Sequence, residues 1–365
     1  MNPLNLHEFH EHLGARFTEV NGREAVQDYG DWAAEHAALR QSAGVLDLSF
    51  RARLCLVGAD RVRFLHGQVT NDVKRLREGE GCYAAITTAK GKMEGDLNIF
   101  CLADELLLDL EPGLGEKISK RLGKYIVADD VQIVDATTPY GLLSVQGPAA
   151  EAVVRALGWF PEIPAQPFGA VKVAHAALGE IYLANQARFG GAVPRGFDFF
   201  VPAESLAGVA ENLVAAAASA GGRACGWQAA ETARIEGGIP RFGADMDESN
   251  LPLECGLEAR AVSYTKGCYI GQEVINRIHS GGHVNRELRG LRLAEGLKTL
   301  PARGDELFHA GREVGQLTSA ARSPALKANI ALGYVRREAG ATGTELTLRT
   351  AEGETTATVV PLPFA

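Results

Sequence analysis

The sequence lacks any long apolar run. In a chain of 365 residues, no uncharged hydrophobic stretch approaches the ~18 residues that a membrane-spanning helix needs. Residues 1–17, MNPLNLHEFHEHLGARF, are too polar and too rich in histidine for the hydrophobic core of a secretory signal. We therefore expect a cytoplasmic protein that has no membrane partner.

An excess of basic residues is also missing. Lysine and arginine together number 37, against 45 aspartates and glutamates, which gives a formal net charge of −8. Proteins that bind DNA or RNA broadly carry a basic surface that neutralises phosphates. We therefore expect no direct nucleic-acid partner.

Cysteine pairs at metal-ligand spacing do not occur. The cysteines are dispersed along the chain, at Cys55, Cys82, Cys101, Cys225, Cys255 and Cys268. This distribution is typical of free thiols in a reducing cytosol. On a helix predicted for residues 4–13, His7, His10 and Glu11 would share one face. A metal site needs further ligands, and none is placed beside them, so we predict no metal.

Glycine, by contrast, is abundant. The chain holds 42 glycines, which predicts many tight turns and parts rich in sheet. Hydrophobic residues make up 46 % and charged residues 22 % of the sequence, as in folded globular proteins. The length exceeds what one core usually holds, so we expect two or three domains.

Helices and short strands alternate through the first 280 residues. A helix is predicted over 31–42 with Asp31 as its N-cap, and a strand over 44–57 is interrupted by charged residues near Arg51. Paired strands are predicted over 82–110, and a helix running into a turn over 225–242. This order indicates layered α+β structure. From residue 284 onward, short alternating strands separated by glycine turns predict a small β-barrel.

The most distinctive stretch is KGCYIGQE, residues 266–273. Cys268 lies between glycines, close to Lys266, just before a helix predicted to begin near Gln272. A lysine and the positive end of a helix both favour a thiolate. The alternative is a buried structural cysteine, because free cysteine is among the most buried residue types. Local chemistry leaves both interpretations open.

The order of these segments resembles the glycine-cleavage T-protein (aminomethyltransferase) superfamily, and within it the YgfZ branch of folate-binding proteins. The resemblance runs almost end to end and rests on residues 6–17, 35–49, 65–73, 81–83, 234–240 and 266–273. The last of these segments is the signature of the YgfZ branch.

The resemblance implies an α+β fold in which three lobes form a ring around a central channel that holds tetrahydrofolate. Two lobes are mixed α/β, roughly residues 1–50 plus 136–280 and residues 51–135. The third lobe is a small antiparallel β-barrel over residues 281–365. A cleft between lobes is a common place for a small ligand.

Several site residues follow from the resemblance. Tyr83 matches an aromatic residue near the pterin, although a strand packing role is the alternative. Asp96 falls at the end of the segment that carries the T-protein's catalytic aspartate, where two adjacent acids are usual and Gly95 here replaces the first. A carboxylate at this place can accept pterin hydrogen bonds or act as a base.

Three further residues are implied to bind the cofactor. Asp198 stands where T-proteins have a glutamate that grips the pterin amino groups, and its side chain is one methylene shorter. Arg234 matches a folate-facing arginine, with a salt bridge to Glu231 or Glu236 as the alternative. Arg188 begins the corresponding Arg-x-Gly turn.

Cys268 is the residue that T-proteins lack, and the resemblance makes it the functional thiol, with Lys266 and Asp96 completing the catalytic set. The main prediction is a tetrahydrofolate-binding accessory protein that supports assembly or repair of iron–sulfur clusters. Its partners are then folate and iron–sulfur client enzymes or assembly proteins. The alternatives are a tetrahydrofolate-dependent aminomethyltransferase and a folate-binding module without chemistry.

Overall fold

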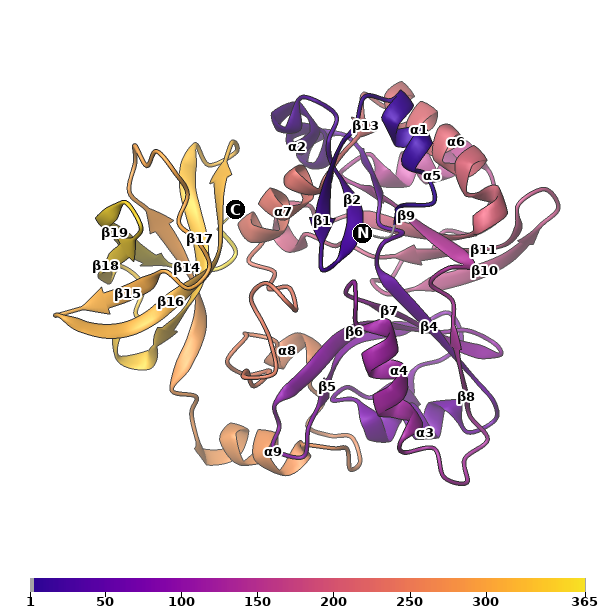
Figure 1. Cartoon of the computed structure of the whole chain (residues 1–365). Coiled ribbons are helices and arrows are strands. Elements are labelled where there is room, and N and C mark those ends of the chain that lie inside the picture. Colours follow the sequence, from indigo (N-terminus) through magenta and orange to yellow (C-terminus); the bar gives the residue numbers. More distant parts are fainter. Residues whose placement is uncertain (1–2, 365) are drawn as a thin grey trace.

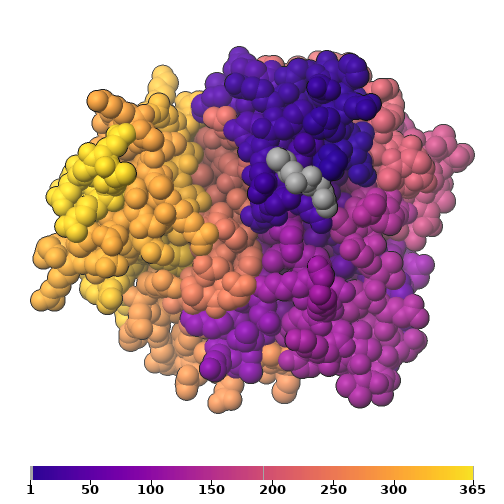
Figure 2. Space-filling view, in the orientation of Figure 1, coloured from indigo at the N-terminus to yellow at the C-terminus, as the bar shows by residue number. Residues whose placement is uncertain are grey.

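The three larger β-sheets form three lobes around a common centre (Figure 1). The structure is a computed structural model that describes residues 3–364. Two lobes are mixed α/β, and the third is a closed barrel. In the space-filling view the barrel, orange and yellow, packs directly against the other lobes (Figure 2). The predicted α+β arrangement of three lobes is therefore confirmed.

The first lobe contains a six-stranded sheet. In spatial order its strands are β10 (Ala170–His175), β11 (Gly179–Asn185), β12 (Gly196–Pro202), β9 (Tyr140–Gln146), β3 (Gly44–Asp47) and β13 (Arg223–Ala224). Successive side chains of a strand point to opposite faces. Phe199 accordingly packs under α5 (Ala150–Leu157) and α6 (Leu206–Ser219), whereas Phe200 packs in the core that includes α2 (Trp32–Gln41) and α7 (Trp227–Glu236). Burial on both faces explains the nearly continuous apolar run of β12.

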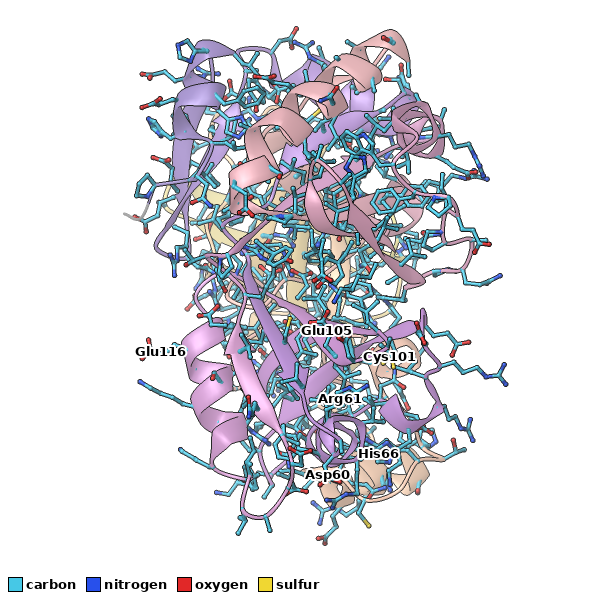
Figure 3. All side chains as sticks on the ribbon, turned by 90° about the vertical axis from the view of Figure 1, so that its right-hand side faces the viewer. Asp60, Arg61, His66, Cys101, Glu105 and Glu116 are labelled. Atoms are coloured by element: carbon cyan, nitrogen blue, oxygen red, sulfur yellow. The ribbon has the colours of Figure 1, made fainter. Side chains whose placement is uncertain are left out.

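The second lobe contains a five-stranded sheet. Its strands are β5 (Gly81–Thr87), β6 (Met93–Cys101), β7 (Glu105–Leu110), β4 (Ala52–Val57) and β8 (Gln132–Asp135), with helices α3 (Arg61–Gln68) and α4 (Gly115–Gly123). Glu105 joins this lobe to the first, because its carboxylate accepts a hydrogen bond from the Tyr182 hydroxyl at 2.8 Å. Figure 3 shows Glu105 at the level where the two lobes meet. The strand predicted over 44–57 is thus two strands, which belong to different sheets.

The third lobe is the barrel. Its strands close in the order β14 (Arg286–Leu293), β17 (Ala328–Arg336), β16 (Arg312–Ser323), β15 (Glu306–His309), β18 (Glu345–Thr350) and β19 (Gly353–Val360). Leucines on the inward-facing positions fill it, among them Leu291, Leu317 and Leu348, which are at most 1 % exposed. The predicted C-terminal β-barrel is confirmed.

The remaining elements lie outside the three larger sheets. They are α1 (His7–His12), the hairpin of β1 (Arg16–Val20) and β2 (Arg23–Asp28), α8 (Glu258–Ala261), α9 (Gln272–Gly281) and four 3₁₀ turns at Val73–Arg75, Gly190–Ala192, Ala203–Ser205 and Arg337–Ala339. Residues 250–281 lie against the second sheet, where Thr70 and Thr87 donate to the carbonyls of Ala261 and Ile270. We propose the lobe boundaries given above with one change: residues 250–281 belong to the second lobe rather than to the first.

The aspartates that precede α2 and α3 make different contacts. Asp31 caps α2 as predicted, since its carboxylate accepts the Ala34 N–H at 3.0 Å. Asp60, by contrast, precedes α3 without a side-chain cap bond and instead accepts the Asp130 N–H.

Across residues 3–364, no helix has the length and apolarity needed to cross a membrane.

Candidate functional site

A cavity opens where the first two lobes meet α7. The cavity has a volume of about 100 Å³. Tyr83, Asp96 and Asn98 line it from β5 and β6, and Arg188 lines it from the loop between β11 and β12. Trp227 lines it from α7. Chain segments far apart in sequence therefore converge on one hollow, the geometry expected of a ligand site between lobes.

Asp96 lies on the cavity side of β6 because side chains alternate along a strand. A Cβ on the preceding Gly95 would lie 3.3 Å from side chains of Leu114 and Ile118, so that position faces α4. An acid at position 95, as T-proteins usually show before this aspartate, would crowd Leu114 and Ile118 and point away from the cavity. Its absence therefore leaves the cavity side of β6 unchanged.

The carboxylate of Asp96 is buried and only half-satisfied. Its Oδ2 accepts a hydrogen bond from the Tyr83 hydroxyl at 2.7 Å, while its Oδ1 has no hydrogen-bond partner in the part of the chain that the structure describes. Burial, together with the negative charge of nearby Glu111, raises the pKa of Asp96 to about 6. This side chain is placed to exchange a proton near neutral pH.

A buried network of charges forms the floor of the cavity. Arg51 donates to both oxygens of Asp109, at 2.8 and 3.1 Å, and also pairs with Glu111. Arg188 donates to Asp109 at 3.0 Å and to Asp198 at 3.1 and 2.6 Å. Burial opposes ionisation of Asp109, but the two guanidinium groups lower its pKa below the ordinary value. The network holds Arg188 in a fixed direction.

Asp198 lies behind this arginine rather than on the cavity wall. It is fully buried, and Arg188 divides its charge between two carboxylates, so burial raises the pKa of Asp198 above its ordinary value. Asp198 therefore reaches a ligand only through Arg188. Direct binding of the cofactor by Asp198 has no contact to support it.

Unsatisfied polar atoms gather on the cavity wall. Besides Asp96 Oδ1, the buried atoms without a hydrogen-bond partner among the described residues include Glu111 Oε2, Gln186 Oε1 and Arg241 Nη1, and all four residues line the cavity. Glu111 Oε2 and Arg241 Nη1 form an ion pair with each other at 3.5 Å. Buried polar atoms without a partner are costly, so the convergence of Asp96 Oδ1 and Gln186 Oε1 on one wall indicates a polar ligand.

Arg234 lines the cavity, but internal contacts occupy it. Its guanidinium donates to Glu231 at 2.9 and 3.2 Å, to Ser319 Oγ at 2.7 Å and to the Ile239 carbonyl at 3.2 Å, and it also pairs with Asp245. The salt-bridge alternative to the folate-facing role is therefore present in the structure. Direct ligand binding by Arg234 stays a prediction.

Cys268 and Lys266 lie outside the cavity wall. Cys268 is exposed. The Lys266 amine is buried and donates to the carbonyls of His66, Val69 and Asn71 at 2.5, 2.6 and 2.9 Å. Burial lowers the pKa of Lys266 to about 8. Lys266 thus anchors the segment to the loop after α3, where Figure 3 labels His66, and has no contact that would stabilise a thiolate at Cys268.

The histidines of α1 are engaged separately. His10 is buried and hydrogen-bonds Asp47 at 2.9 Å and Tyr29 at 2.8 Å, whereas His7 hydrogen-bonds Glu24 at 2.7 Å. Within residues 3–364, no three His, Cys, Asp or Glu side chains gather in a way that could hold a metal ion.

Comparison with known proteins places this arrangement in a family. The GCVT N-terminal domain family matches residues 6–266, and the glycine cleavage T-protein C-terminal barrel domain family matches residues 286–365. The chain belongs to the glycine cleavage T-protein family. The barrel and the two α/β lobes are the two matched regions of that family.

Relatives within the T-protein family cover nearly the whole chain. The aminomethyltransferase of Geobacillus thermodenitrificans is 31 % identical over 353 residues, which are 96 % of this chain and 94 % of the relative. That of Rubrobacter xylanophilus is 32 % identical over 369 residues, covering 98 % and 93 %. The crystal structure of glycine cleavage system aminomethyltransferase T from Bartonella henselae has the same fold, with a TM-score of 0.88 at 24 % identity, covering 100 % and 98 % of the two chains.

Within this T-protein fold, sequence reasoning missed several cavity residues. Asn98 and Glu111 were passed over, as were Gln186, Trp227 and Arg241. A signal was available for Asn98, which interrupts the apolar run Leu97-Asn98-Ile99-Phe100 and is only 7 % exposed. A polar side chain inside a buried strand needs a partner. No comparable signal exists for the others, because their neighbours come from distant segments.

Proposed function

We propose that this protein binds tetrahydrofolate in the cavity and acts as an aminomethyltransferase that moves a one-carbon unit onto the folate. The observation that carries the proposal is the buried, half-satisfied Asp96 at the wall of a polar hollow. The family and the aminomethyltransferase relatives support it. They favour this function over the iron–sulfur accessory role, for which neither offers support.

The polar atoms of the cavity fit a pterin ring. A pterin carries an amino group and ring N–H groups as donors and an oxo group as an acceptor. The wall offers acceptors at Asp96 Oδ1 and Gln186 Oε1, which have no hydrogen-bond partner among residues 3–364. Glu111 Oε2 and Arg241 Nη1, which form an ion pair with each other at 3.5 Å, add an acceptor and a donor. Tyr83 and Trp227 supply aromatic faces beside them. Donors and acceptors are therefore present in complementary kinds.

Asp96 is suited to move a proton during the transfer. Breaking the bond between the one-carbon unit and its amine needs a proton on the departing nitrogen, and the folate nitrogen that gains the unit must release one. A carboxyl whose pKa is raised to about 6 can serve as donor and acceptor near neutral pH. Tyr83 holds the side chain in place through its 2.7 Å hydrogen bond.

The test measures one-carbon transfer from an aminomethylated lipoyl protein to tetrahydrofolate. We expect the protein to catalyse transfer and Asp96→Asn to lower the rate by about 10²–10⁴-fold. Asp104→Asn, at an exposed acid in the loop before β7, is the matched control. Absence of folate binding, or equal rates for both variants, would overturn the proposal.

A second candidate rests on Cys268. This thiol is exposed on the segment that resembles the YgfZ signature and lies outside the cavity wall, an arrangement that suits contact with a large partner rather than with the folate. The function is then support of iron–sulfur cluster assembly or repair, with tetrahydrofolate bound in the cavity. One cysteine cannot hold a cluster alone, so a client or assembly protein must complete the ligand set.

Complementation separates the two candidates. In a strain that lacks its own YgfZ-type protein, Cys268→Ala should fail to restore the activity of iron–sulfur enzymes, whereas Cys82→Ala, at a half-buried thiol, should restore it. The same Cys268 variant should retain folate binding. Full restoration by Cys268→Ala would remove this candidate and leave the first unaffected.

A further inference from the structure

The cavity is smaller than the ligand that its polar wall suits. Its volume is about 100 Å³, whereas sites for small molecules commonly enclose roughly 300–1,000 Å³. A bicyclic pterin ring therefore enters only if part of the wall moves. The part that moves must be one whose departure leaves no buried charge without a partner, because such a charge is costly.

The side chain of Arg241 bridges two walls of the cavity. Its guanidinium lies over the ring of Trp227, 5.1 Å from the ring centroid, and its Nη1 lies 3.5 Å from Glu111 Oε2. Trp227 belongs to α7, whereas Glu111 directly follows β7 in the second lobe. A flat cation on an aromatic face is a favourable arrangement. In this protein it covers the aromatic face and the acceptor that a planar ligand would use.

Arg241 can leave the cavity without isolating a carboxylate. Glu111 also pairs with Arg51 through its other oxygen. Glu231, which accepts a hydrogen bond from Arg241 Nε at 3.2 Å, also accepts one from Arg234 at 2.9 Å. Both carboxylates therefore keep a cation when the Arg241 side chain turns away, and the cost of a buried unpaired charge does not arise.

The movement needs no change in the main chain. The Arg241 N–H donates to the Asp245 carboxylate at 3.1 Å, and the Arg241 carbonyl accepts the Asp245 N–H at 2.8 Å, so the backbone stays in place. The Arg241 side chain is 15 % exposed, against 9 % for Arg188 and 5 % for Arg234. Rotation about its side-chain bonds is therefore enough to carry the guanidinium to the rim of the cavity.

We propose that Arg241 is a gate: in the free protein its guanidinium takes the place of the ligand's planar ring, and a folate binds only after this side chain has turned out. The inference rests on the proposed folate binding and adds the residue that controls entry. The pyrimidine half of a pterin contains a flat guanidine unit edged with N–H donors, so it can replace Arg241 on the Trp227 ring and at the Glu111 carboxylate. From the rim, Arg241 Nη1 can still donate to the bound ring.

The experiment measures the association rate constant of tetrahydrofolate by stopped-flow quenching of tryptophan fluorescence, which Trp227 in the cavity wall reports. Arg241→Ala should bind roughly 5- to 20-fold faster than wild type, because the closed state loses its contacts. Arg241→Lys, which keeps the charge but not the flat fork, should show a smaller increase. Arg292→Ala, at an exposed arginine on β14, is the matched control and should not bind faster.

The sign of the change decides between a gate and a simple charge effect. Loss of a positive charge by itself slows the association of an anionic ligand, whereas loss of the gate speeds it. An unchanged or lower rate in Arg241→Ala and Arg241→Lys overturns the inference and leaves folate binding intact. An equal increase in Arg292→Ala also overturns it. Failure of wild type and all variants to bind overturns the proposed function and the inference together.

Discussion

Asp96 carries the chemistry in the proposed function, and its burial has a cost. A carboxylate in a poorly solvated wall is destabilised in its charged form, which is why its pKa rises. The hydrogen bond from Tyr83 offsets part of this penalty. Ionisable groups with shifted pKa values concentrate at functional sites. At Asp96 the raised pKa accompanies an Oδ1 atom that has no hydrogen-bond partner among the described residues.

The raised pKa of Asp96 predicts a specific dependence of stability on pH. The folded-state pKa is about 6 against an ordinary 3.8, so the native state holds the proton more tightly than the unfolded chain does. The contribution of Asp96 to the free energy of unfolding therefore falls as pH rises from about 4 to about 6 and remains lower above that range. Relative to wild type, Asp96→Asn should gain roughly 2–3 kcal/mol at about pH 8 compared with about pH 4.

Urea unfolding at the two pH values measures the difference. Asp104→Asn again serves as the control, since that acid is exposed. If the stability of Asp96→Asn relative to wild type is the same at both pH values, Asp96 does not titrate as the structure requires.

At the scale of the element, the start of α9 shows how a loop is locked onto a sheet. Gly271 has a φ of +92°, and a Cβ there would lie 2.5 Å from Thr87 Oγ1 and 2.6 Å from the Thr88 carbonyl oxygen. Thr87 also donates to the Ile270 carbonyl at 2.6 Å. The glycine is therefore required both by backbone conformation and by close packing. It fixes the exposed Cys268 segment against β5.

Gly271→Ala should destabilise the protein by about 2 kcal/mol or more, because it combines an unfavourable φ with a steric clash. Gly281→Ala at the other end of the same helix is the matched control: no described atom lies within 4 Å of its added Cβ. That control should be neutral or stabilising by up to about 1 kcal/mol. Thermal unfolding of the two variants tests the contrast, and equal values would contradict it.

At the scale of the whole molecule, Arg234 ties α7 to the barrel. It pairs with Asp245 and donates to Ser319 on β16 at 2.7 Å, while Thr318 donates to the other oxygen of Asp245 at 2.5 Å. Glu236 makes a second tie, pairing with His36 on α2 and accepting from Ser323 of β16. The lobes are therefore held by buried polar networks as well as by apolar contact.

Arg234→Ala should cost about 3–5 kcal/mol of unfolding free energy, because it leaves Asp245 buried without its cation. Arg349→Ala, which breaks an exposed pair with Glu354 on the barrel, should cost no more than about 1 kcal/mol. Denaturant unfolding of both variants measures this. A loss in Arg234→Ala as small as that of the control would show that Arg234 is free to serve a ligand, as the family resemblance implies.

The sequence by itself determined the local structure and the family. Asp31 capping α2, the helix that begins at Gln272 and the alternating strands of the barrel were all predictable, because caps and periodicities depend on residues a few positions apart. The resemblance also located Tyr83, Asp96, Arg188 and Arg234, each of which lines the cavity.

Only the tertiary structure decided what those side chains touch. It placed Lys266 on three carbonyls rather than beside the Cys268 thiol, and it set Asp198 behind Arg188. It also brought Arg241 to the cavity wall. The three carbonyls that Lys266 contacts lie about two hundred positions away in the chain, and no local pattern records that choice.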